Sequence, residues 1–341
     1  PSIKATLKRG FQWVSATFGP HTRSQPAPRL LVLMYHRVLP QNDIRNRFEE
    51  PGMIITPPSF ELHLDLIRKY FQPIQLGDWV ERCKNGDPLP DRACAITFDD
   101  GWADNFEFAF PALRAQNIPA TIFLVSDLIG TQDMFWPERL ARLLDYISGS
   151  TIDLNISPSL TWLSSLLPVD NNKLEKTLDR ESLAVIINKA KQYGDTGINR
   201  HLDDIYTALA IQIKPEHASL LNWEQVREMS ESGLIEMASH TRRHIRLNES
   251  TPADVMEQEI VSSKAIIEAN TGQPVRSFCF PNGDYSPTSL ENVRKTYDSA
   301  VTTKSGWNTR NDDMHLLSRI SIHEGVASDK TAFLARVSGW M

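Results

Sequence analysis

The sequence predicts an α/β fold in which a parallel barrel of about seven strand–helix units is interrupted by a mainly helical insertion. Short apolar runs typical of buried strands alternate with longer segments that have helical spacing. Strands separated by helices pair in parallel, and about seven such units favour a closed barrel over an open sheet. The alternation stops between residues 131 and 220 and resumes afterwards, which indicates an insertion.

Residues 1–28 form an amphipathic segment ahead of the barrel. Apolar residues recur at helical spacing between residues 3 and 14, and Lys4, Lys8 and Arg9 lie beside them. Such a helix can lie on an anionic membrane surface as a peripheral contact, or it can pack on its own domain, and the pattern leaves both open. The apolar face consists of Ile3, Leu7, Phe11 and Val14.

The first part of the barrel is expected in residues 29–130. RLLVLMYH, at 29–36, is a continuous apolar run that stops at a histidine, as a strand buried on both faces does. CAITF at 94–98 and ATIFLV at 120–125 repeat this pattern. Ser59 is placed to cap a helix that follows the first strand. Further helices are expected around residues 76–83 and 104–116.

The insertion is expected at residues 131–220, and the barrel resumes at 221–341. FWPERLARLLDYI and two later helix-like segments predict that the insertion is helical and not a structureless loop. In the second part of the barrel, LIEMASH at 234–240 and SFCFPNG at 277–283 predict strands, and SAVTT and LSRISI follow them. Helices are expected at 222–233, 252–272 and 287–297, with a closing helix at the end.

The composition narrows the class of protein. A net charge of −6 without a long basic block excludes nucleic acid as an expected partner. Cys83, Cys94 and Cys279 lack CxxC spacing, and we expect Cys94 and Cys279, which lie in strand-like runs, to be core residues instead of disulfide partners. No apolar run is long enough to span a membrane, and no signal peptide is visible, so a cytoplasmic location is expected. Loose membrane association and a clipped export signal stay open.

Polar residues follow several of the expected strands. Asp99 and Asp100 end one strand side by side, although neighbouring carboxylates repel and burial of either is costly. His240 ends another strand, and His244 follows it by four residues. Because barrel strands end at one shared rim, two histidines and one carboxylate can hold a divalent metal there if the histidine segment turns like a helix. The second aspartate is then free to take a proton from water.

Two further strands end in polar groups, His36 and Asn282, and both are expected at the same rim. His315 and His323 flank the last strand and are weaker candidates for that rim. The remaining histidines lie in terminal, helical or insertion segments and are expected to pack or to face solvent. They are His21, His63, His201 and His217.

TFDDG at 97–101 and SHTRRH at 239–244 resemble the first two motifs of the polysaccharide deacetylase family, that is, the NodB-homology or family 4 carbohydrate esterases. MYHRV, PATIFL and FPNGDYS are similar to the bacterial branch with an early MYH motif, which includes de-N-acetylases of biofilm poly-N-acetylglucosamine. The resemblance spans roughly residues 30–130 and 220–323 and leaves the insertion outside.

The resemblance implies a distorted (β/α)7-type barrel that hydrolyses N-acetyl groups on a sugar with a divalent metal, most often zinc. It assigns Asp99 as general base and Asp100, His240 and His244 as metal ligands. In the branch with the MYH motif, the histidine of that motif takes the role of the acid. His36 is therefore the candidate acid, and His323 is the reserve.

The chain departs from the family at its third motif, where Cys279 stands in place of an arginine that orients the base. Arg319, in LSRISI, is the expected substitute from another strand. Asn282, Gly283 and Tyr285 are candidates for oxyanion or substrate contacts. Trp102 and Trp307 are candidates for stacking on a sugar ring, with packing as the alternative for each.

The expected substrate is an amino-sugar glycan, or a lipid-linked or nucleotide-linked sugar that serves as its precursor. An O-acetyl esterase shares the same motifs and stays open as an alternative. A carbohydrate-binding relic without turnover is less favoured because base and ligands are all present. A two-metal phosphohydrolase would need further clustered ligands and a phosphate-binding loop, and neither stands out.

Overall fold

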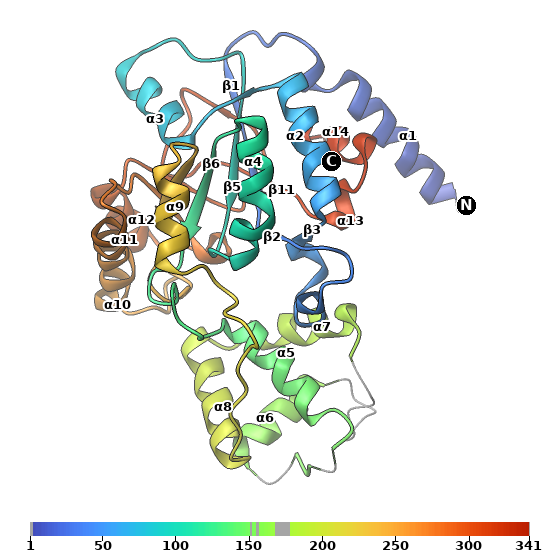
Figure 1. The fold of residues 1–341 in the computed structure, drawn as a ribbon, viewed down its shortest axis with the longest axis vertical. Helices are drawn as coiled ribbons and strands as arrows, with labels where there is room; N and C mark the ends of the chain where they lie inside the picture. The colour runs from blue at the N-terminus through green and yellow to red at the C-terminus, as the bar shows by residue number, and fades with distance from the viewer. Residues whose placement is uncertain (1–2, 151, 155–156, 168–177, 341) are drawn as a thin grey trace. The chain divides into compact units, whose positions relative to one another are not determined.

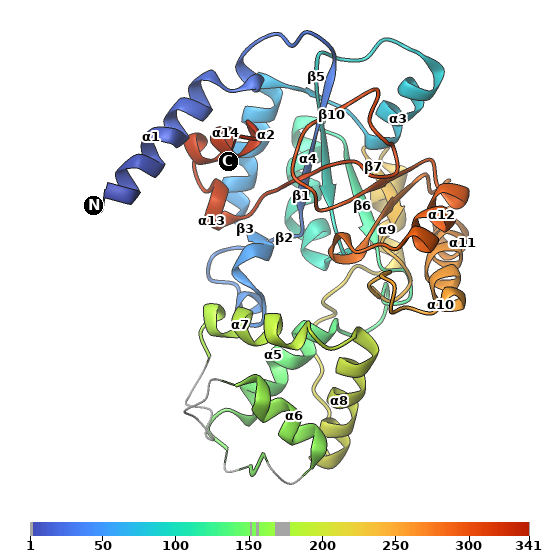
Figure 2. The ribbon, with the colours of Figure 1, turned by 180° about the vertical axis from the view of Figure 1, so that it is seen from behind.

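The computed structural model describes residues 3–150, 152–154, 157–167 and 178–340, and the side chains of residues 3–6 are outside the description. The described chain forms two compact units (Figures 1 and 2). The barrel unit comprises residues 1–40, 52–131 and 220–341, and the helical unit comprises 41–51 and 132–219. The structure thus groups residues 41–51 with the helical unit, whereas the sequence analysis counted them with the barrel.

The barrel unit contains a curled sheet of mainly parallel strands. Its hydrogen-bonded order is β10-β1-β5-β6-β7-β8-β9, with β11 also paired to β1 and β4 to β5. A separate pair joins β2 to β3. The strands are β1 (Arg29–Tyr35), β2 (Arg37–Val38), β3 (Ile54–Ile55), β4 (Gln72–Pro73), β5 (Arg92–Phe98), β6 (Ala120–Leu124), β7 (Ile235–Ser239), β8 (Ser277–Cys279), β9 (Ser299–Val301), β10 (Asn308–Thr309) and β11 (Ile320–Ser321).

The chain between β9 and β11 brings the two ends of the sheet together. Leu317 forms a parallel bridge with Val301 of β9, and Ile320 of β11 pairs with Leu33 of β1. This segment is irregular, and β11 contains two residues where the sequence predicted one strand through LSRISI. The sheet is therefore the distorted barrel that the sequence predicted, closed along one seam by short pairings.

Alternate residues of each strand face the barrel interior, and most of these inward-facing residues are apolar. Residues from β1, β5, β6, β7, β8 and β9 form one buried cluster with Trp79 of helix α3 (Leu76–Asn85). In β5 the alternation runs through Ala93, Ala95 and Thr97, and its continuation places Asp99 on the interior side at the carboxyl end. Catalytic groups of parallel barrels lie at this end of the strands.

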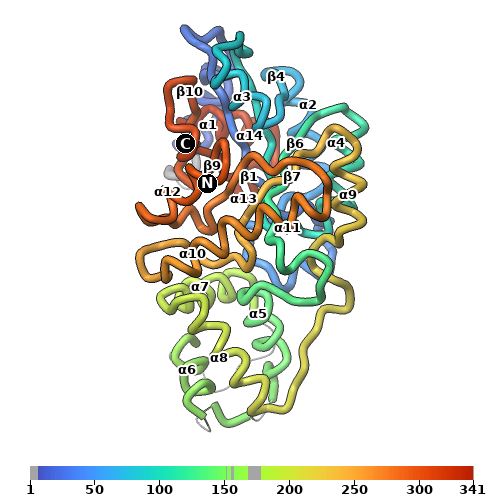
Figure 3. Tube along the Cα trace, turned by 90° about the vertical axis from the view of Figure 1, so that its left-hand side faces the viewer, coloured from blue at the N-terminus to red at the C-terminus, as the bar shows by residue number. Residues whose placement is uncertain are grey.

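Helices cover the outside of the sheet. For example, α9 and α11 both pack on β7 and lie side by side (Figure 3). An Asn222–Gln225 capping box starts α9. The helices of this unit are α1 (Ile3–Phe18), α2 (Pro57–Tyr70), α3 (Leu76–Asn85), α4 (Phe110–Gln116), α9 (Trp223–Glu231), α10 (Ala253–Glu257), α11 (Ser263–Thr271), α12 (Pro287–Thr296), α13 (Glu324–Ala327) and α14 (Lys330–Val337).

The structure corrects one local expectation and adds detail to another. Thr56, and not Ser59, caps α2, because the helix begins at Pro57 and the Thr56 hydroxyl accepts a hydrogen bond from the Ser59 amide. The helix expected at 104–116 begins with a π-helical turn, Asn105–Ala109, before α4.

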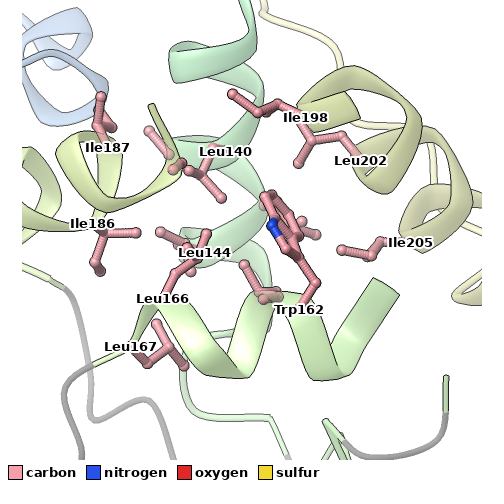
Figure 4. Packing of buried hydrophobic residues seen from close by; sticks show 14 of the residues in the cluster. Leu140, Leu144, Trp162, Leu166, Leu167, Ile186, Ile187, Ile198, Leu202 and Ile205 are labelled. Atoms are coloured by element: carbon pink, nitrogen blue, oxygen red, sulfur yellow. The ribbon is translucent and has the colours of Figure 1, made fainter. Parts of the chain in front are cut away.

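The helical unit has its own apolar core, built from α5 (Trp136–Ile147), α6 (Pro158–Leu166), α7 (Arg180–Ala190) and α8 (Asp195–Ala208). Leu140 and Leu144 of α5 face Trp162 of α6 and Leu202 of α8 across this core (Figure 4). Each helix buries one apolar stripe, as expected for a bundle. Among the described helices of the whole chain, none combines the length and apolarity needed to cross a bilayer.

Candidate active site

Asp99 and Asp100 lie where β5 ends. The Asp99 amide still donates to the Tyr35 carbonyl at 3.0 Å, so this residue prolongs the strand. Asp100 leaves the strand with a positive φ of 76°, followed by Gly101 at 79°. A Cβ on Gly101 would lie 2.9 Å from the Leu124 side chain, and together with the positive φ this favours glycine in the turn. Both carboxylates are buried, and the turn gives each of them a different set of partners.

Arg319 binds Asp99 through two parallel hydrogen bonds, with Nη1 to Oδ1 at 2.7 Å and Nη2 to Oδ2 at 2.8 Å. The guanidinium is buried and held from behind, because Nε donates to the Thr302 carbonyl and Nη1 to the Thr97 hydroxyl. Burial alone would raise the pKa of Asp99, but the charge and hydrogen bonds of Arg319 outweigh it and lower that pKa. Asp99 is therefore held as a carboxylate.

Cys279 lies beside this pair. Arg319 Nη2 approaches the Cys279 sulfur at 3.2 Å, and the thiol donates to Asp99 Oδ2 at 3.5 Å. Burial raises the pKa of the Cys279 thiol, so it stays protonated. The guanidinium beside this small side chain comes from the segment just before β11. The role of Arg319 as a substitute for the arginine of the third motif stays a prediction.

Asp100, His240 and His244 form a second cluster on the other side of the turn. Oδ1 of Asp100 lies 3.4 Å from His240 Nε2 and 3.5 Å from His244 Nε2. The two histidines do not converge through a helical turn, which corrects the condition set from the sequence. A loop brings them together instead, with positive φ at Thr241 and His244 and a hydrogen bond from the His244 amide to the Thr241 hydroxyl.

The donor set of this cluster fits a divalent cation. His240 Nδ1 faces the Cys279 carbonyl at 2.8 Å, and a carbonyl only accepts, so Nδ1 carries the hydrogen. In the neutral ring the Nε2 lone pair then faces Asp100 Oδ1 at 3.4 Å, and either a bound cation or a proton on Nε2 stabilises this contact. A carbonyl behind a ligating histidine is also the usual support of metal sites.

A second possible donor set is Asp99, His240 and Cys279, whose ligand atoms also lie within 4.8 Å of one another. It is the weaker candidate, because Arg319 already occupies both oxygens of Asp99 and the thiol is protonated. The first set, with two imidazoles and one carboxylate, is a common zinc-type arrangement with open positions.

His36 and His323 lie on the same rim. His36 follows β1, and its Nε2 is 3.8 Å from Asp99 Oδ2. β11 pairs with β1, and the Ile322 amide donates to the Met34 carbonyl, which brings His323 to this end of the sheet. Nδ1 of each histidine is buried without a hydrogen-bond partner among the described residues. Burial, with Arg336 and His36 nearby, lowers the pKa of His323.

Of the other aromatic and imidazole candidates, His315 and Trp307 lie near the amino end of the strands, whereas Trp102 is buried beside Asp100. His315 binds the Tyr297 carbonyl, just before β9, and so sits at the amino end of the strands. The Trp307 indole donates to the Val337 carbonyl at 2.8 Å and packs as part of the fold. Trp102 is only 3% exposed, so it offers little surface to a sugar ring. Packing, the alternative considered for both tryptophans, is what the structure shows.

Trp102 belongs to a buried network that sequence reasoning missed. Its indole donates to Asp100 Oδ2 at 2.9 Å, and the Arg37 guanidinium lies 4.1 Å above its ring. Asp104 binds Arg37 at 2.9 Å and the Val38 amide at 2.8 Å. The network therefore links the metal ligand candidate to the segment that carries His36. No single-sequence signal pairs residues 37 and 104, which lie far apart along the chain.

Asn282, Gly283 and Tyr285 lie in the loop after β8. Asn282 and Gly283 have positive φ values of 55° and 74°, and a Cβ on Gly283 would lie 2.2 Å from the Thr303 hydroxyl. Asn282 is exposed and Tyr285 is 42% exposed. Tyr285 forms a backbone bridge with Leu247, in the segment that follows His244. The loop is thus open to solvent beside the histidine segment.

Residues 86–152 and 184–297 match the model of the family described as Polysaccharide deacetylase. The YxkH protein of Bacillus subtilis is 22% identical over 307 residues, which cover 89% of this chain and 75% of that protein. The poly-beta-1,6-N-acetyl-D-glucosamine N-deacetylase of Escherichia coli K12 is 25% identical over 171 residues, which cover 50% of this chain and 15% of that protein.

Solved structures share the fold. The Streptococcus pyogenes deacetylase PplD in complex with acetate matches with a TM-score of 0.59 at 17% identity, over 91% of this chain and 99% of that chain. IcaB from Ammonifex degensii matches with a TM-score of 0.56 at 18% identity, over 91% of this chain and 98% of that chain. These matches confirm the fold class expected from the sequence.

Proposed function

Because this chain belongs to the polysaccharide deacetylase family, as its motifs predicted, we propose that it removes N-acetyl groups from an amino-sugar glycan by metal-dependent hydrolysis. The observation that carries the proposal is the separation of the two neighbouring carboxylates. Asp100 faces two histidine nitrogens, while Asp99 is held by an arginine on the other side of the turn. This gives one carboxylate for a cation and one for a proton.

Asp100, His240 and His244 would hold the cation, and zinc is the proposed metal. Bound there, the cation supplies a Lewis acid that polarises the acetamide carbonyl and makes water more acidic. Trp102 keeps Asp100 in place through its indole hydrogen bond, and the Cys279 carbonyl keeps His240 oriented. The chain thus supplies ligand atoms for the cation that are held in fixed positions.

Asp99 is the proposed general base. It takes the proton of the attacking water while Arg319 fixes both of its oxygens. The water oxygen forms the new bond to the acetyl carbon, and the carbon–nitrogen bond breaks. His36 is the proposed acid that gives a proton to the departing amine, with its Nε2 3.8 Å from Asp99; His323 remains the second candidate. Acetate and a free amino sugar result.

The substrate proposal rests on the relatives. The Escherichia coli relative is named for poly-beta-1,6-N-acetyl-D-glucosamine, although the match covers 15% of it. We propose a glycan of this class, or its lipid-linked or nucleotide-linked precursor, with Asn282, Gly283 and Tyr285 in contact with the sugar. The assignment to the branch with the early MYH motif and the cytoplasmic location stay predictions.

Acetate release from a panel of N-acetylated and O-acetylated sugars tests the proposal. The panel includes polymeric, nucleotide-linked and lipid-linked sugars, and the protein is reconstituted with zinc. We expect release from N-acetylated substrates that Asp99→Asn abolishes. Asp65→Asn changes an exposed carboxylate on α2 and is the matched control. Release from O-acetylated sugars alone would favour the esterase, and no release with zinc bound would favour the carbohydrate-binding relic.

A further inference from the structure

Helix α1 exposes a row of large apolar side chains. They recur at i, i+4, i+7 and i+11, so they share one face of the helix. Trp13, which is 58% exposed, packs edge to face against Phe18 with ring centroids 6.1 Å apart. The row consists of Leu7 (68% exposed), Phe11 (51%), Val14 (41%) and Phe18 (56%). We call these four residues the apolar row of α1.

The opposite side of α1 packs on α14, and both views of the ribbon show the two helices side by side (Figures 1 and 2). The residues on that side are small or polar. Ser15 is buried, and Gln12 and Ala16 are half-buried. A surface helix normally turns its large apolar residues toward the protein and its polar residues outward. In the described part of α1 the large apolar side chains face solvent instead.

The charge around the apolar row has one sign. Residues 1–29 contain five of the 36 basic residues and none of the 42 acidic residues of a chain whose net charge is −6. Lys8 and Arg9 are both exposed on α1. Lys8 borders the apolar face, whereas Arg9, two residues from both Leu7 and Phe11, projects from the other side of the helix. An apolar face in a segment whose charged residues are all basic complements a surface that is anionic outside and apolar beneath.

We infer that α1 docks the protein on an anionic lipid bilayer. The apolar row enters the boundary between headgroups and acyl chains, and Lys8, at the edge of that face, contacts lipid phosphates. The helix lies in the plane of the surface, because an amphipathic helix of this kind buries only one face. This inference is independent of the proposed function, since none of its residues belongs to the candidate active site.

Vesicle co-sedimentation with the full chain tests the inference. Phosphatidylcholine vesicles are used with and without phosphatidylglycerol, at low and high salt. We expect binding to the anionic vesicles that weakens at high salt. Leu7→Ser with Phe11→Ser removes apolar surface, Lys8→Glu with Arg9→Glu reverses charge, and each pair should reduce binding by about tenfold or more. Val261→Ser, at an exposed apolar residue far along the chain, should bind as the parent does.

Two results would overturn the inference. One is the absence of binding to anionic vesicles, or equal binding by all variants. The other is a dimer in light scattering that the Leu7→Ser, Phe11→Ser pair dissolves, which would make the apolar row an interface between copies. All substitutions lie at exposed positions, and unchanged circular dichroism together with unchanged acetate release from a soluble substrate would show that the barrel is intact.

Discussion

At the scale of single residues, two adjacent aspartates differ because their surroundings differ. Asp99 continues the strand and meets a buried guanidinium, whereas Asp100 turns away with positive φ and meets two imidazoles. The bidentate contact from Arg319 requires a planar fork, which lysine lacks. The identity of residue 319 should therefore matter for the orientation of Asp99 and not only for its charge.

Arg319→Lys tests this orientation. The substitution keeps the positive charge but loses one of the two hydrogen bonds to Asp99. We expect kcat for deacetylation to fall about 100-fold, since a misaligned base loses much of its contribution, while KM changes little. Steady-state kinetics on the substrate found by the acetate assay measure both. Arg294→Lys, in an exposed pair with Asp313, is the control. If Arg319→Lys had the same kcat as the parent protein, Arg319 would not position the base.

Asp104→Asn tests the buried network beneath the site. Arg37 and Asp104 are almost fully buried, so the substitution removes the carboxylate charge that faces the guanidinium in the interior. We expect the free energy of unfolding to fall by about 3 kcal/mol. Urea unfolding followed by circular dichroism measures the change. The double variant Arg37→Met, Asp104→Asn should lose less stability than the sum of its single variants, and strict additivity would contradict the pairing.

At the scale of elements, the strands and their flanking helices fix the rim. β1 and β5 pair along their whole length, which brings His36 and Asp99 to the same level. Behind β1, His63 of α2 joins two elements, because its Nε2 binds the Ala327 carbonyl at the end of α13 and its Nδ1 faces the Tyr35 hydroxyl. This histidine is buried and neutral, so its protonation should loosen the packing of α2.

The pH dependence of stability follows from His63. Burial lowers the pKa of His63 to about 4 from 6.5. Between pH 6.5 and 4 the unfolded chain binds a proton that the folded chain does not, so the stability due to this group is full above pH 6.5, falls as the pH is lowered and levels off below 4. The loss should reach about 3 kcal/mol.

Urea unfolding of the parent and of His63→Gln across this pH range measures the effect. The variant should be less stable at pH 7 but should show a shallower decline toward pH 4, because the titrating group is gone. Exposed His217→Gln should keep the parental slope. An identical slope in the parent and in His63→Gln would assign the acid sensitivity to other groups, such as His21, whose pKa is also lowered by burial.

At the scale of the whole molecule, two units with separate cores share one chain. The chain leaves and re-enters the barrel unit at neighbouring points, since the Gly130 amide donates to the Leu221 carbonyl at 2.9 Å. Units with their own cores can unfold as separate cooperative transitions. The metal ligand candidates belong to the barrel unit alone.

Differential scanning calorimetry should therefore show two unfolding transitions. Zinc should raise the midpoint temperature of one of them, the transition of the barrel unit. Free zinc at 100 times its dissociation constant stabilises the barrel by about 2.7 kcal/mol, and a chelator removes this effect. His244→Ala should abolish the zinc-dependent shift, whereas His217→Ala should keep it. A single transition would contradict the division into two cooperative units, and a shift that persists in His244→Ala would place the metal elsewhere.

The sequence by itself determined the fold class and the family. The buried strands RLLVLMYH and CAITF, with helices between them, follow from local apolar patterns, and TFDDG with SHTRRH predicted the family that the comparisons confirm. These signals are short in range, because strand burial, helix spacing and turn chemistry depend on neighbouring residues. The residues of the candidate site were also named from the sequence, and their roles stay predictions.

Only the tertiary structure decided which residues meet across the barrel. Arg319 reaches Asp99 because the irregular segment before β11 closes the sheet, and Arg37 reaches Asp104 because β2 lies beside the π-helical turn that follows β5. The sequence also did not predict the loop that joins His240 to His244 with two positive φ values. Such contacts depend on strand register and chain closure, which join residues far apart in sequence and leave no local periodic pattern.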